Sequence, residues 1–349
     1  MTKLSFAIPG DLATPTGGYA YDRQVMALLP QHGIEVAHLL LPGGFPFPSE
    51  EEVLETARLL ASVADDTVLL VDGLASGALP AECFAELSAP VVVMLHHPLG
   101  LETGLDEAAS RKLLATEKAA LGFARHIIVT SRTTAATLIE LGFAPPPPVT
   151  IAEPGTERAP RAAGSGESGC QILSIGSVVP RKGHDLLVEA LSRLTHLDWQ
   201  CTIAGSLDRD GDFAGPLVRR VEAGELRDRI RFAGVLPGET LPALYAAADI
   251  FAMPSRYEGY GMVFAEALAR GLPVVAARAG AVPDTVPPEA GILVLSEDVD
   301  ALTEALASLI TDRALRQKLS DAAWAHAETL PRWDDTAKII AKVVKEVSA

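Results

Sequence analysis

The chain has 349 residues and a formal net charge of −16 at pH 7, and 48% of its residues are hydrophobic. This length favours two domains of roughly 100–200 residues each, and the hydrophobic fraction is sufficient for two cores. The negative net charge argues against nucleic acid as a partner. Residues 1–157 contain 19 acidic and 8 basic residues, which predicts at most weak peripheral contact with an anionic membrane.

The N-terminal segment Met1–Pro9 is too short, and too soon interrupted by proline, to be a secretory signal. Its apolar run Leu4–Ile8 is typical of a β-strand instead. No uninterrupted apolar run in the chain reaches the length of a membrane-spanning helix. The three cysteines (Cys83, Cys170 and Cys201) are widely spaced and form no C-x-x-C pair, which fits a reducing compartment. We therefore expect a cytoplasmic protein, with peripheral contact at the inner membrane face as the only membrane association.

Short apolar runs alternate with longer helix-like stretches in both halves of the chain. In the first half these runs are Leu4–Ile8, Ile34–Leu41, Thr67–Val71, Val91–Leu95, Ile127–Thr130 and Val149–Ala152. In the second half they are Ile172–Gly176, Gln200–Ala204, Ile230–Ala233, Ile250–Met253, Val274–Ala277 and Ile292–Leu295. Nearly continuous apolar strands separated by helices are typical of parallel sheets covered on both faces. The pattern predicts an α/β protein with two Rossmann-like domains of about six strands each.

A glycine pair, Gly17-Gly18, lies in the segment Asp11–Tyr21, which follows the first predicted strand and opens a helix. Because glycine has no Cβ, it lets backbone N–H groups approach a phosphate closely. Loops between a strand and a helix also favour glycine without any ligand, so the residues alone leave both interpretations open. The pair is not a G-x-G-x-x-G dinucleotide fingerprint.

Two histidines, His96 and His97, follow the predicted buried strand Val91–Leu95. Ligands of open parallel sheets bind beyond the carboxyl ends of the strands, which is where these side chains are expected. A histidine at a strand end is often only a well-bonded polar residue, so a structural role remains the alternative.

The boundary between the two predicted domains can be read from composition. The four prolines Pro145–Pro148 predict a stiff spacer before the last strand of the first half. The segment Arg161–Gly169 is rich in Gly, Ser and Ala and predicts a flexible linker. We therefore assign residues 1–160 to the first domain and residues 170–330 to the second.

Two cations, Arg181 and Lys182, lie in the segment Ser174–Leu187, which again has the order strand, loop and helix start. Both could neutralise a phosphate group, and arginine can do so through two parallel hydrogen bonds. The alternative is a solvated pair of charges. We disfavour it because cations at a helix start oppose the helix dipole.

The segment Pro254–Glu266 joins a glycine-rich loop to a predicted helix and carries a glutamate at each end, Glu258 and Glu266. A helix start preceded by glycines offers free N–H groups and a positive dipole end, which suit phosphate. Carboxylates accept hydrogen bonds from hydroxyl groups, which sugars carry in number. A phosphate site flanked by two hydroxyl acceptors is what a sugar nucleotide requires.

The seven residues between Glu258 and Glu266, in the frame Pro254-Ser255 followed by Glu258-Gly259-Tyr260-Gly261, resemble the E-x7-E element of retaining family-4 glycosyltransferases. The resemblance covers nearly the whole chain. It implies a GT-B fold in which the first domain binds the acceptor and the second binds the nucleotide sugar. It also implies that the tail, residues 331–349, forms a final helix that crosses back onto the first domain.

The resemblance assigns roles to the loop residues found above. His96 matches the family's histidine beside the donor sugar, with His97 as the competitor if the match slips by one residue. Lys182 matches a family cation for the leaving diphosphate, and Arg181 is expected to replace the arginine that the family has where this chain has Ser177. Glu258 is expected to hold sugar hydroxyls and Glu266 the ribose hydroxyls.

Further donor contacts are expected from the same comparison. They are Gly17, Gly18, Val235, Gly259, Tyr260, Gly261, Met262 and Val263. The resemblance implies no metal and no cofactor, with a UDP- or GDP-linked sugar as substrate. The segment Asp208-Arg209-Asp210 has the letters of a metal-binding D-x-D motif. Its position after a predicted strand is more typical of a polar turn.

The sequence therefore predicts a retaining glycosyltransferase that moves a sugar from a nucleoside-diphosphate donor to a hydroxyl acceptor (a glycan, a glycolipid or a small molecule). Fixed positive charge and helix N-terminal amides would stabilise the departing diphosphate. Two alternatives remain: a sugar-nucleotide epimerase of the same fold, and a non-catalytic nucleotide-binding protein.

Overall fold

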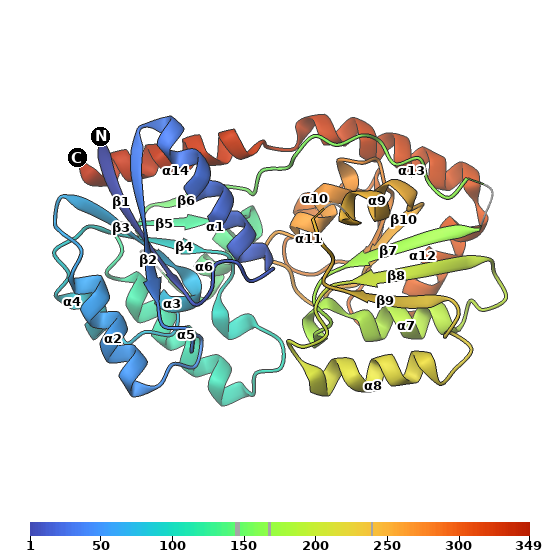
Figure 1. The fold of residues 1–349 in the computed structure, drawn as a ribbon, viewed down its shortest axis with the longest axis horizontal. Coiled ribbons are helices and arrows are strands. Elements are labelled where there is room, and N and C mark those ends of the chain that lie inside the picture. The colour runs from blue at the N-terminus through green and yellow to red at the C-terminus, as the bar shows by residue number, and fades with distance from the viewer. Residues whose placement is uncertain (144–146, 167–168, 239) are drawn as a thin grey trace. The chain divides into compact units, whose positions relative to one another are not determined.

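The structure is a computed structural model that describes residues 1–143, 147–166, 169–238 and 240–349. The chain divides into two compact units, shown in Figure 1. Unit 1 comprises Met1–Gly155 together with Pro331–Ala349, and unit 2 comprises Thr156–Leu330. Each unit contains one six-stranded sheet in which every strand pair is parallel. The prediction of two parallel α/β units is confirmed.

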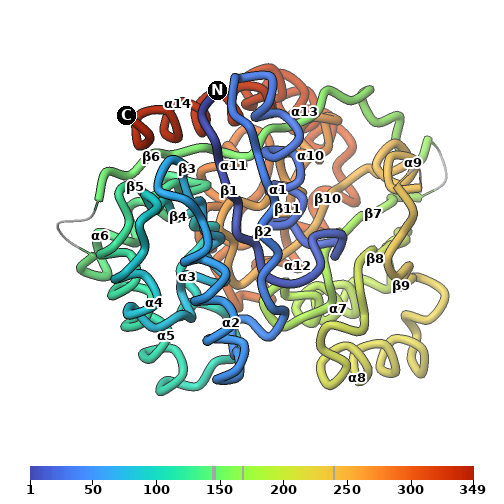
Figure 2. The backbone as a smooth tube through the Cα atoms, turned by 60° about the vertical axis from the view of Figure 1, so that its left-hand side comes forward, coloured from blue at the N-terminus to red at the C-terminus, as the bar shows by residue number. Residues whose placement is uncertain are grey.

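The sheet of unit 1 has the strand order β2-β1-β3-β4-β5-β6, and its strands run side by side in Figure 2. Their bounds are β1 Thr2–Pro9, β2 Ile34–Leu41, β3 Thr67–Asp72, β4 Val91–Leu95, β5 His126–Val129 and β6 Val149–Ile151. All five residues of β4 are buried. Full burial of a Val or Leu side chain is worth about 1.5–3 kcal/mol, which explains why such continuous apolar runs mark central strands.

Helices cover both faces of this sheet. The described helices of unit 1 are α1 Gly17–Leu28, α2 Glu50–Ala61, α3 Gly73–Ser76, α4 Glu82–Ala85, α5 Glu107–Leu121, α6 Arg132–Glu140 and α14 Trp333–Ser348, with short 3₁₀ turns at Leu29–His32 and Leu99–Leu101. Their starts follow local chemistry. Ser49, for example, caps α2 and exchanges hydrogen bonds with Glu52, which is a capping box.

The C-terminal helix α14 packs on unit 1, in contact with α1 and with strands β1, β3 and β5. The ring of Trp333 meets that of Tyr21 edge to face, with centroids 5.7 Å apart. Thr336 Oγ1 donates a hydrogen bond to the Glu153 carbonyl at 2.7 Å. A Cβ on Gly155 would lie 2.2 Å from the Trp333 nitrogen, so only glycine fits there. These contacts fix the start of the helix to the unit that contains the chain's first strand.

The sheet of unit 2 has the order β12-β11-β10-β7-β8-β9. Its strands are β7 Cys170–Ile175, β8 Trp199–Ala204, β9 Ile230–Gly234, β10 Ile250–Met253, β11 Val274–Ala277 and β12 Gly291–Val294. The described helices are α7 His184–Ser192, α8 Gly211–Glu222, α9 Thr240–Ala247, α10 Met262–Leu268, α11 Val282–Thr285, α12 Val299–Thr311 and α13 Arg313–His326, with 3₁₀ turns at Pro180–Lys182 and Ala327–Thr329. No described helix is both long and apolar enough to cross a membrane.

The predicted flexible linker behaves differently from the prediction. Within it, the Ala162 N–H donates to the Arg270 carbonyl at 2.8 Å, and the N–H groups of Ala163 and Gly164 donate to the Ala246 carbonyl at 2.9 and 3.1 Å. Composition suggested mobility, but these backbone hydrogen bonds tie residues 162–164 to the rest of unit 2. Glu167 and Ser168 of the predicted linker, and Pro145 and Pro146 of the predicted proline spacer, lie outside the described residues.

Candidate functional site

Each unit gathers polar side chains at the carboxyl ends of its strands, the usual place for ligands in parallel α/β sheets. In unit 2 these side chains come from the loops after β7 and β10. In unit 1 they come from α1 and from the ends of β3 and β4. The two clusters are described separately.

The unit 2 cluster is centred on Glu258, whose side chain is only 6% exposed. Its Oε1 accepts hydrogen bonds from Lys182 Nζ and from Ser255 Oγ, both at 2.7 Å. Its Oε2 accepts one from a guanidinium nitrogen of Arg181 at 3.2 Å. The structure thus brings both predicted cations onto one predicted glutamate, across 76 and 77 positions of sequence.

This pairing keeps Glu258 ionised. Burial raises the pKa of its carboxyl group, but the charges of Lys182 and Arg181 and the hydrogen bonds from Lys182 and Ser255 outweigh burial and lower the pKa to about 2. Lys182 and Arg181 thus place two positive charges beside one buried carboxylate. Cations held in place in this way are of the kind that bind phosphate groups.

A second arginine, Arg256, joins the two loops and was not predicted. Its guanidinium binds both carboxylate oxygens of Asp185 at 2.9 and 2.8 Å, and its Nε donates to Glu297 at 2.6 Å. Its backbone N–H donates to the Arg181 carbonyl at 2.7 Å. Arg256 therefore holds the loop that carries the cations against the loop that carries Glu258. Nothing in the local sequence signals this, since its partners are distant.

Glycines allow these loops to approach closely. A Cβ on Gly183 would lie 2.1 Å from the Pro254 carbonyl oxygen, and Gly183 has a φ of +67°, which also favours glycine. Gly261, with a φ of +87°, directly precedes α10. On α10, Glu266 Oε2 accepts a hydrogen bond from the Tyr245 hydroxyl at 2.8 Å, and burial raises the pKa of Glu266. The backbone of Met262 begins that helix, as the sequence predicted for a phosphate-binding helix start.

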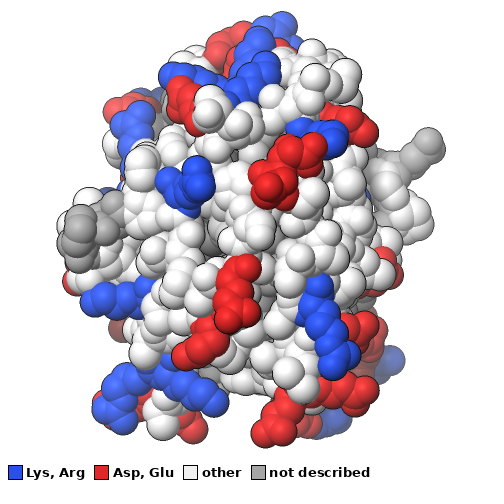
Figure 3. Space-filling view, turned by 90° about the vertical axis from the view of Figure 1, so that its left-hand side faces the viewer, with Lys and Arg blue, Asp and Glu red and all other residues white. Residues whose placement is uncertain are grey.

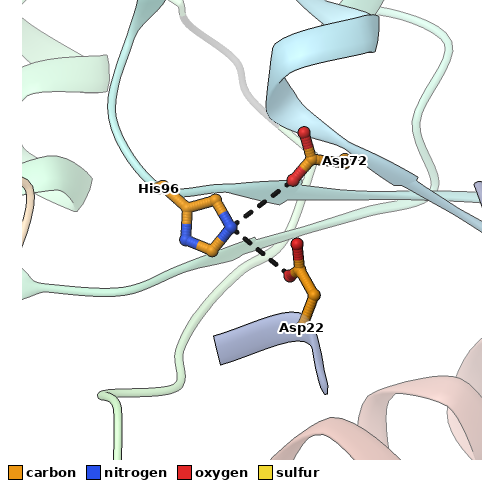
Figure 4. Close-up of side chains that lie close together, drawn as sticks. All are labelled: Asp22, Asp72 and His96. Atoms are coloured by element: carbon orange, nitrogen blue, oxygen red, sulfur yellow. Dashed lines mark ion pairs between the residues drawn. The ribbon is translucent and has the colours of Figure 1, made fainter. Parts of the chain in front are cut away.

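The unit 1 cluster is centred on His96, which follows β4 (Figure 4). Its Nε2 lies 3.4 Å from Asp22 Oδ1 and 3.4 Å from Asp72 Oδ2. Asp22 is on α1, and Asp72 is the last residue of β3. A Cβ on Gly18 would lie 3.5 Å from the His96 ring, so the structure brings two of the predicted residues, Gly18 and His96, together.

In this cluster two carboxylates lie around one basic group, whereas in unit 2 two basic groups lie around one carboxylate. The carboxylates of Asp22 and Asp72 are 0% and 3% exposed. Burial lowers the pKa of His96, but the two aspartate carboxylates beside Nε2 raise it to about 10. Burial raises the pKa of Asp22, and His96 acts against that rise. The two buried carboxylates therefore favour the protonated form of His96.

Sequence reasoning missed Asp22 and Asp72. Asp72 could have been found, since it ends a buried strand and precedes a glycine, but Asp22 has no signal within its helix. One donor atom each from Asp22, Asp72 and His96 lies within 4.8 Å of the others, so this set could also hold a divalent cation.

The remaining predicted residues occupy varied positions. His97 Nε2 lies 3.1 Å from Glu102 Oε2, so His97 pairs with its own loop. Gly17 is the first residue of α1, and no atom would meet a Cβ there within 4 Å. Val235 is exposed, whereas Tyr260 is buried. Gly259 and Val263 lie beside the glutamates in the segment from Glu258 to Glu266. The Asp208–Asp210 pair forms a turn in which Asp210 caps α8.

Comparison with known proteins gives matches along the chain. Residues 156–326 match the family described as "Glycosyl transferases group 1". A D-inositol 3-phosphate glycosyltransferase of Salinispora tropica is 31% identical over 257 residues, which is 67% of this chain and 53% of that protein. An MMP alpha-(1->4)-mannosyltransferase of Mycolicibacterium hassiacum is 27% identical and aligned over 88% of this chain and 78% of that protein. The chain spans about half the length of several curated relatives that it matches.

Solved structures resemble the chain over its whole length. A sucrose-phosphate synthase from Thermosynechococcus elongatus has a TM-score of 0.84 at 22% identity and covers 99% of both chains. Anabaena Alr3699/HepE, solved in complex with UDP and glucose, has a TM-score of 0.76 at 20% identity and covers 99% of this chain and 100% of its own. At such identities the likeness concerns the fold. It confirms the predicted GT-B architecture of two Rossmann-like domains.

Proposed function

We propose that the chain is a member of the glycosyl transferases group 1 family, whose model matches residues 156–326, and that it transfers a sugar from a nucleoside-diphosphate sugar to a hydroxyl acceptor. The observation that carries this proposal is the convergence of Lys182 and Arg181 on Glu258, at the carboxyl ends of β7 and β10. Such a site supplies fixed positive charge beside groups that accept hydrogen bonds from hydroxyls. The names of the relatives favour transfer over the alternative of an epimerase.

In this proposal the difficult step is the departure of the diphosphate from the anomeric carbon of the sugar. Lys182 and Arg181 stabilise the charge that develops on the leaving oxygen, because they are fixed in place before the reaction begins. Glu258 holds both cations, and its contact with sugar hydroxyls stays a prediction. Glu266 contacts the ribose, and His96 contacts the transferred sugar.

The finer features of the reaction are also proposals. We propose that Lys182 and Arg181 stabilise the departing diphosphate without a metal ion or another cofactor. Retention of the anomeric configuration is proposed from the family resemblance. Solved relatives in complex with UDP and a curated relative named for GDP-mannose support UDP and GDP as the two bases to test first.

Peripheral membrane contact is the least supported part of the proposal. On the face shown in Figure 3, basic and acidic side chains are interspersed and separated by wide uncharged areas. A face that binds anionic lipid by charge would gather Lys and Arg instead. The excess of acidic over basic residues in residues 1–157 points the same way, so we propose a soluble or glycan acceptor before a lipid one.

The test begins with ligand binding. UDP, GDP, ADP and their sugar conjugates are added separately to the protein, and the midpoint of thermal unfolding is measured. A nucleotide that binds the folded state raises this midpoint in proportion to its affinity and concentration. We expect one base to raise it and the others to have little effect. A panel in which no nucleotide or sugar nucleotide shifts the midpoint at millimolar concentration contradicts the proposal.

The second step separates transfer from epimerisation. The stabilising sugar nucleotide is incubated with the enzyme and followed by NMR, first alone and then with candidate acceptors. A transferase leaves the donor sugar's configuration unchanged without an acceptor and releases nucleoside diphosphate when the acceptor is present. A change of configuration at one carbon of the intact donor would identify an epimerase instead.

A further inference from the structure

Two buried carboxylates, Asp22 and Asp72, lie beside His96. The function proposed above gives a role to His96 but none to these two aspartates. We propose that Asp22 and Asp72 are positioning residues, which fix the His96 imidazole through Nε2 and present its Nδ1–H to an oxygen of the transferred sugar. The part of this proposal that concerns the sugar rests on the function proposed above. The part that concerns the imidazole stands on the structure of unit 1 alone.

The geometry gives the two ring nitrogens different environments. Nε2 is buried and lies 3.4 Å from an oxygen of each carboxylate. In Figure 4 Nδ1 faces away from both carboxylates. The His96 side chain is 23% exposed although Nε2 is not, so the accessible part of the ring lies away from the aspartates. A ligand can therefore reach the side of the ring that carries Nδ1.

The alternative orientation of the ring is unfavourable. Turning the imidazole over would move Nε2 away and place a ring carbon opposite the carboxylates. Both oxygens of Asp22 are buried and have no hydrogen-bond partner among the described residues, so the nearby imidazole is their compensation. Leaving a buried carboxylate without such compensation costs several kcal/mol. Tyr21, whose ring meets the imidazole edge to face at 5.3 Å, limits its movement further.

Among the described residues, few charged or titratable groups face His96. Asp22 and Tyr21 come from α1, and Asp72 comes from β3. Arg23 acts on Asp22 by its charge. The Tyr21 hydroxyl donates to the Ala152 carbonyl at 2.9 Å, and burial keeps that phenol neutral by raising its pKa. The net effect on His96 is therefore set by the two aspartates, which favour the doubly protonated ring.

A doubly protonated imidazole has a definite chemistry. Both ring nitrogens are hydrogen-bond donors and neither can accept a proton. In that form His96 donates a hydrogen bond to a sugar oxygen and does not act as a general base. The two aspartates act through His96 and do not touch the sugar in this proposal, which distinguishes them from catalytic residues.

The first experiment needs no substrate. Protein labelled with ¹⁵N-histidine is titrated by NMR from pH 5.5 to 10, and the His96 signals are assigned by their loss in His96→Gln. In the wild-type protein we expect the doubly protonated ring to persist through pH 8. In Asp22→Asn, which keeps the shape of the side chain but removes its charge, we expect the His96 midpoint to fall by at least one pH unit. Asp66→Asn, the same change at an exposed site of unit 1, should leave the midpoint unchanged.

Two results would overturn the proposal. One is a wild-type His96 that titrates near pH 6.5, or a midpoint that Asp22→Asn does not move. The other is one equivalent of Zn²⁺, measured by elemental analysis after dialysis against the ion, that wild-type protein retains and Asp22→Asn loses. That result would make the cluster a metal site. If Asp22→Asn does not fold, Asp72→Asn gives the same test, because its amide oxygen can still accept from the Leu74 N–H that Asp72 caps.

The kinetic experiment tests the contact with the sugar. With the donor identified above, Asp22→Asn should lower kcat by up to about 100-fold at pH 8 while KM for the donor changes little, because a misplaced group loses transition-state contacts. Its kcat should also fall with rising pH where wild-type kcat is constant. An unchanged kcat together with a shifted NMR midpoint overturns the sugar contact alone. A wild-type protein that transfers no sugar rejects the proposed function, and the NMR result then decides the positioning role independently.

Discussion

Both polar clusters lie at the carboxyl ends of strands in six-stranded parallel sheets, but they combine charges in opposite ways. In unit 2, two cations surround one buried carboxylate, and the pKa of Glu258 falls to about 2. In unit 1, two buried carboxylates surround one imidazole, and the pKa of His96 rises to about 10. The fold therefore fixes the location of a site, whereas the residues decide its chemistry. A cationic cluster suits a diphosphate, and a carboxylate-held histidine suits the hydroxyls of a sugar.

The largest effect should follow from removing the central carboxylate of unit 2. We expect Glu258→Ala to abolish transfer and to lower the free energy of unfolding by about 3–5 kcal/mol, because both cations lose a buried partner. Urea denaturation measures the stability and a transfer assay the activity. Glu304→Ala, an exposed site on α12, is the matched control. A variant with wild-type stability would show that the cluster is not a coupled ion-pair network.

Removing one cation should cost activity more than stability. Lys182→Ala is expected to lower kcat by about 10²–10³-fold, the usual cost of losing one preorganised charge or donor at a leaving group. Lys318→Ala, on an exposed position of α13, should leave kcat unchanged. Turnover near the wild-type level in Lys182→Ala, with every active donor, would remove Lys182 from the proposed mechanism.

The loop contact made by Arg256 should have an intermediate effect. Arg256→Ala removes charge-assisted hydrogen bonds to Asp185 and Glu297, each worth roughly 1.5–3 kcal/mol before solvent exposure is considered. Because Arg256 is 20% exposed and Glu297 58% exposed, we expect a net loss near the lower figure, measured by urea denaturation. Lys3→Ala, which breaks an exposed ion pair of unit 1, should cost much less, because solvent screens that pair. Equal losses in the two variants would show that the Arg256 contact is an ordinary surface pair.

The smallest effects should appear in the pH dependence of stability, at opposite ends of the scale. The pKa of Glu258 is lowered from 4.5 to about 2, so its contribution is present above pH 4.5 and is lost as pH falls towards 2. The pKa of His96 is raised from 6.5 to about 10, so its contribution is present below pH 6.5 and is lost as pH rises towards 10. Glu258→Gln should flatten the acid limb of the stability curve, and His96→Gln the alkaline limb. If Glu258→Gln changed the alkaline limb and His96→Gln the acid limb, the pKa shifts proposed for both residues would be wrong.

Local sequence was sufficient for the strands and for several loop residues. Each of the twelve predicted runs became a strand within about two residues, because a parallel strand covered on both faces must be apolar along its length. The helix start at Gly261-Met262 also followed from its glycine. The tail helix begins at Trp333, where the Asp335 carboxylate accepts a hydrogen bond from the Arg332 N–H at 3.1 Å.

Tertiary structure alone decided which charges meet. Asp22, Asp72 and His96 are widely separated in sequence, and they meet because β1 and β4 both flank β3 in the sheet. Strand order results from packing of the entire unit, so no local pattern around Asp22 could reveal it. The docking of the segment near Ala162 has the same origin, since its hydrogen-bond acceptors, the carbonyl groups of Ala246 and Arg270, lie much later in the chain. Periodicity within one segment determines secondary structure, whereas contacts between distant segments determine charge and protonation.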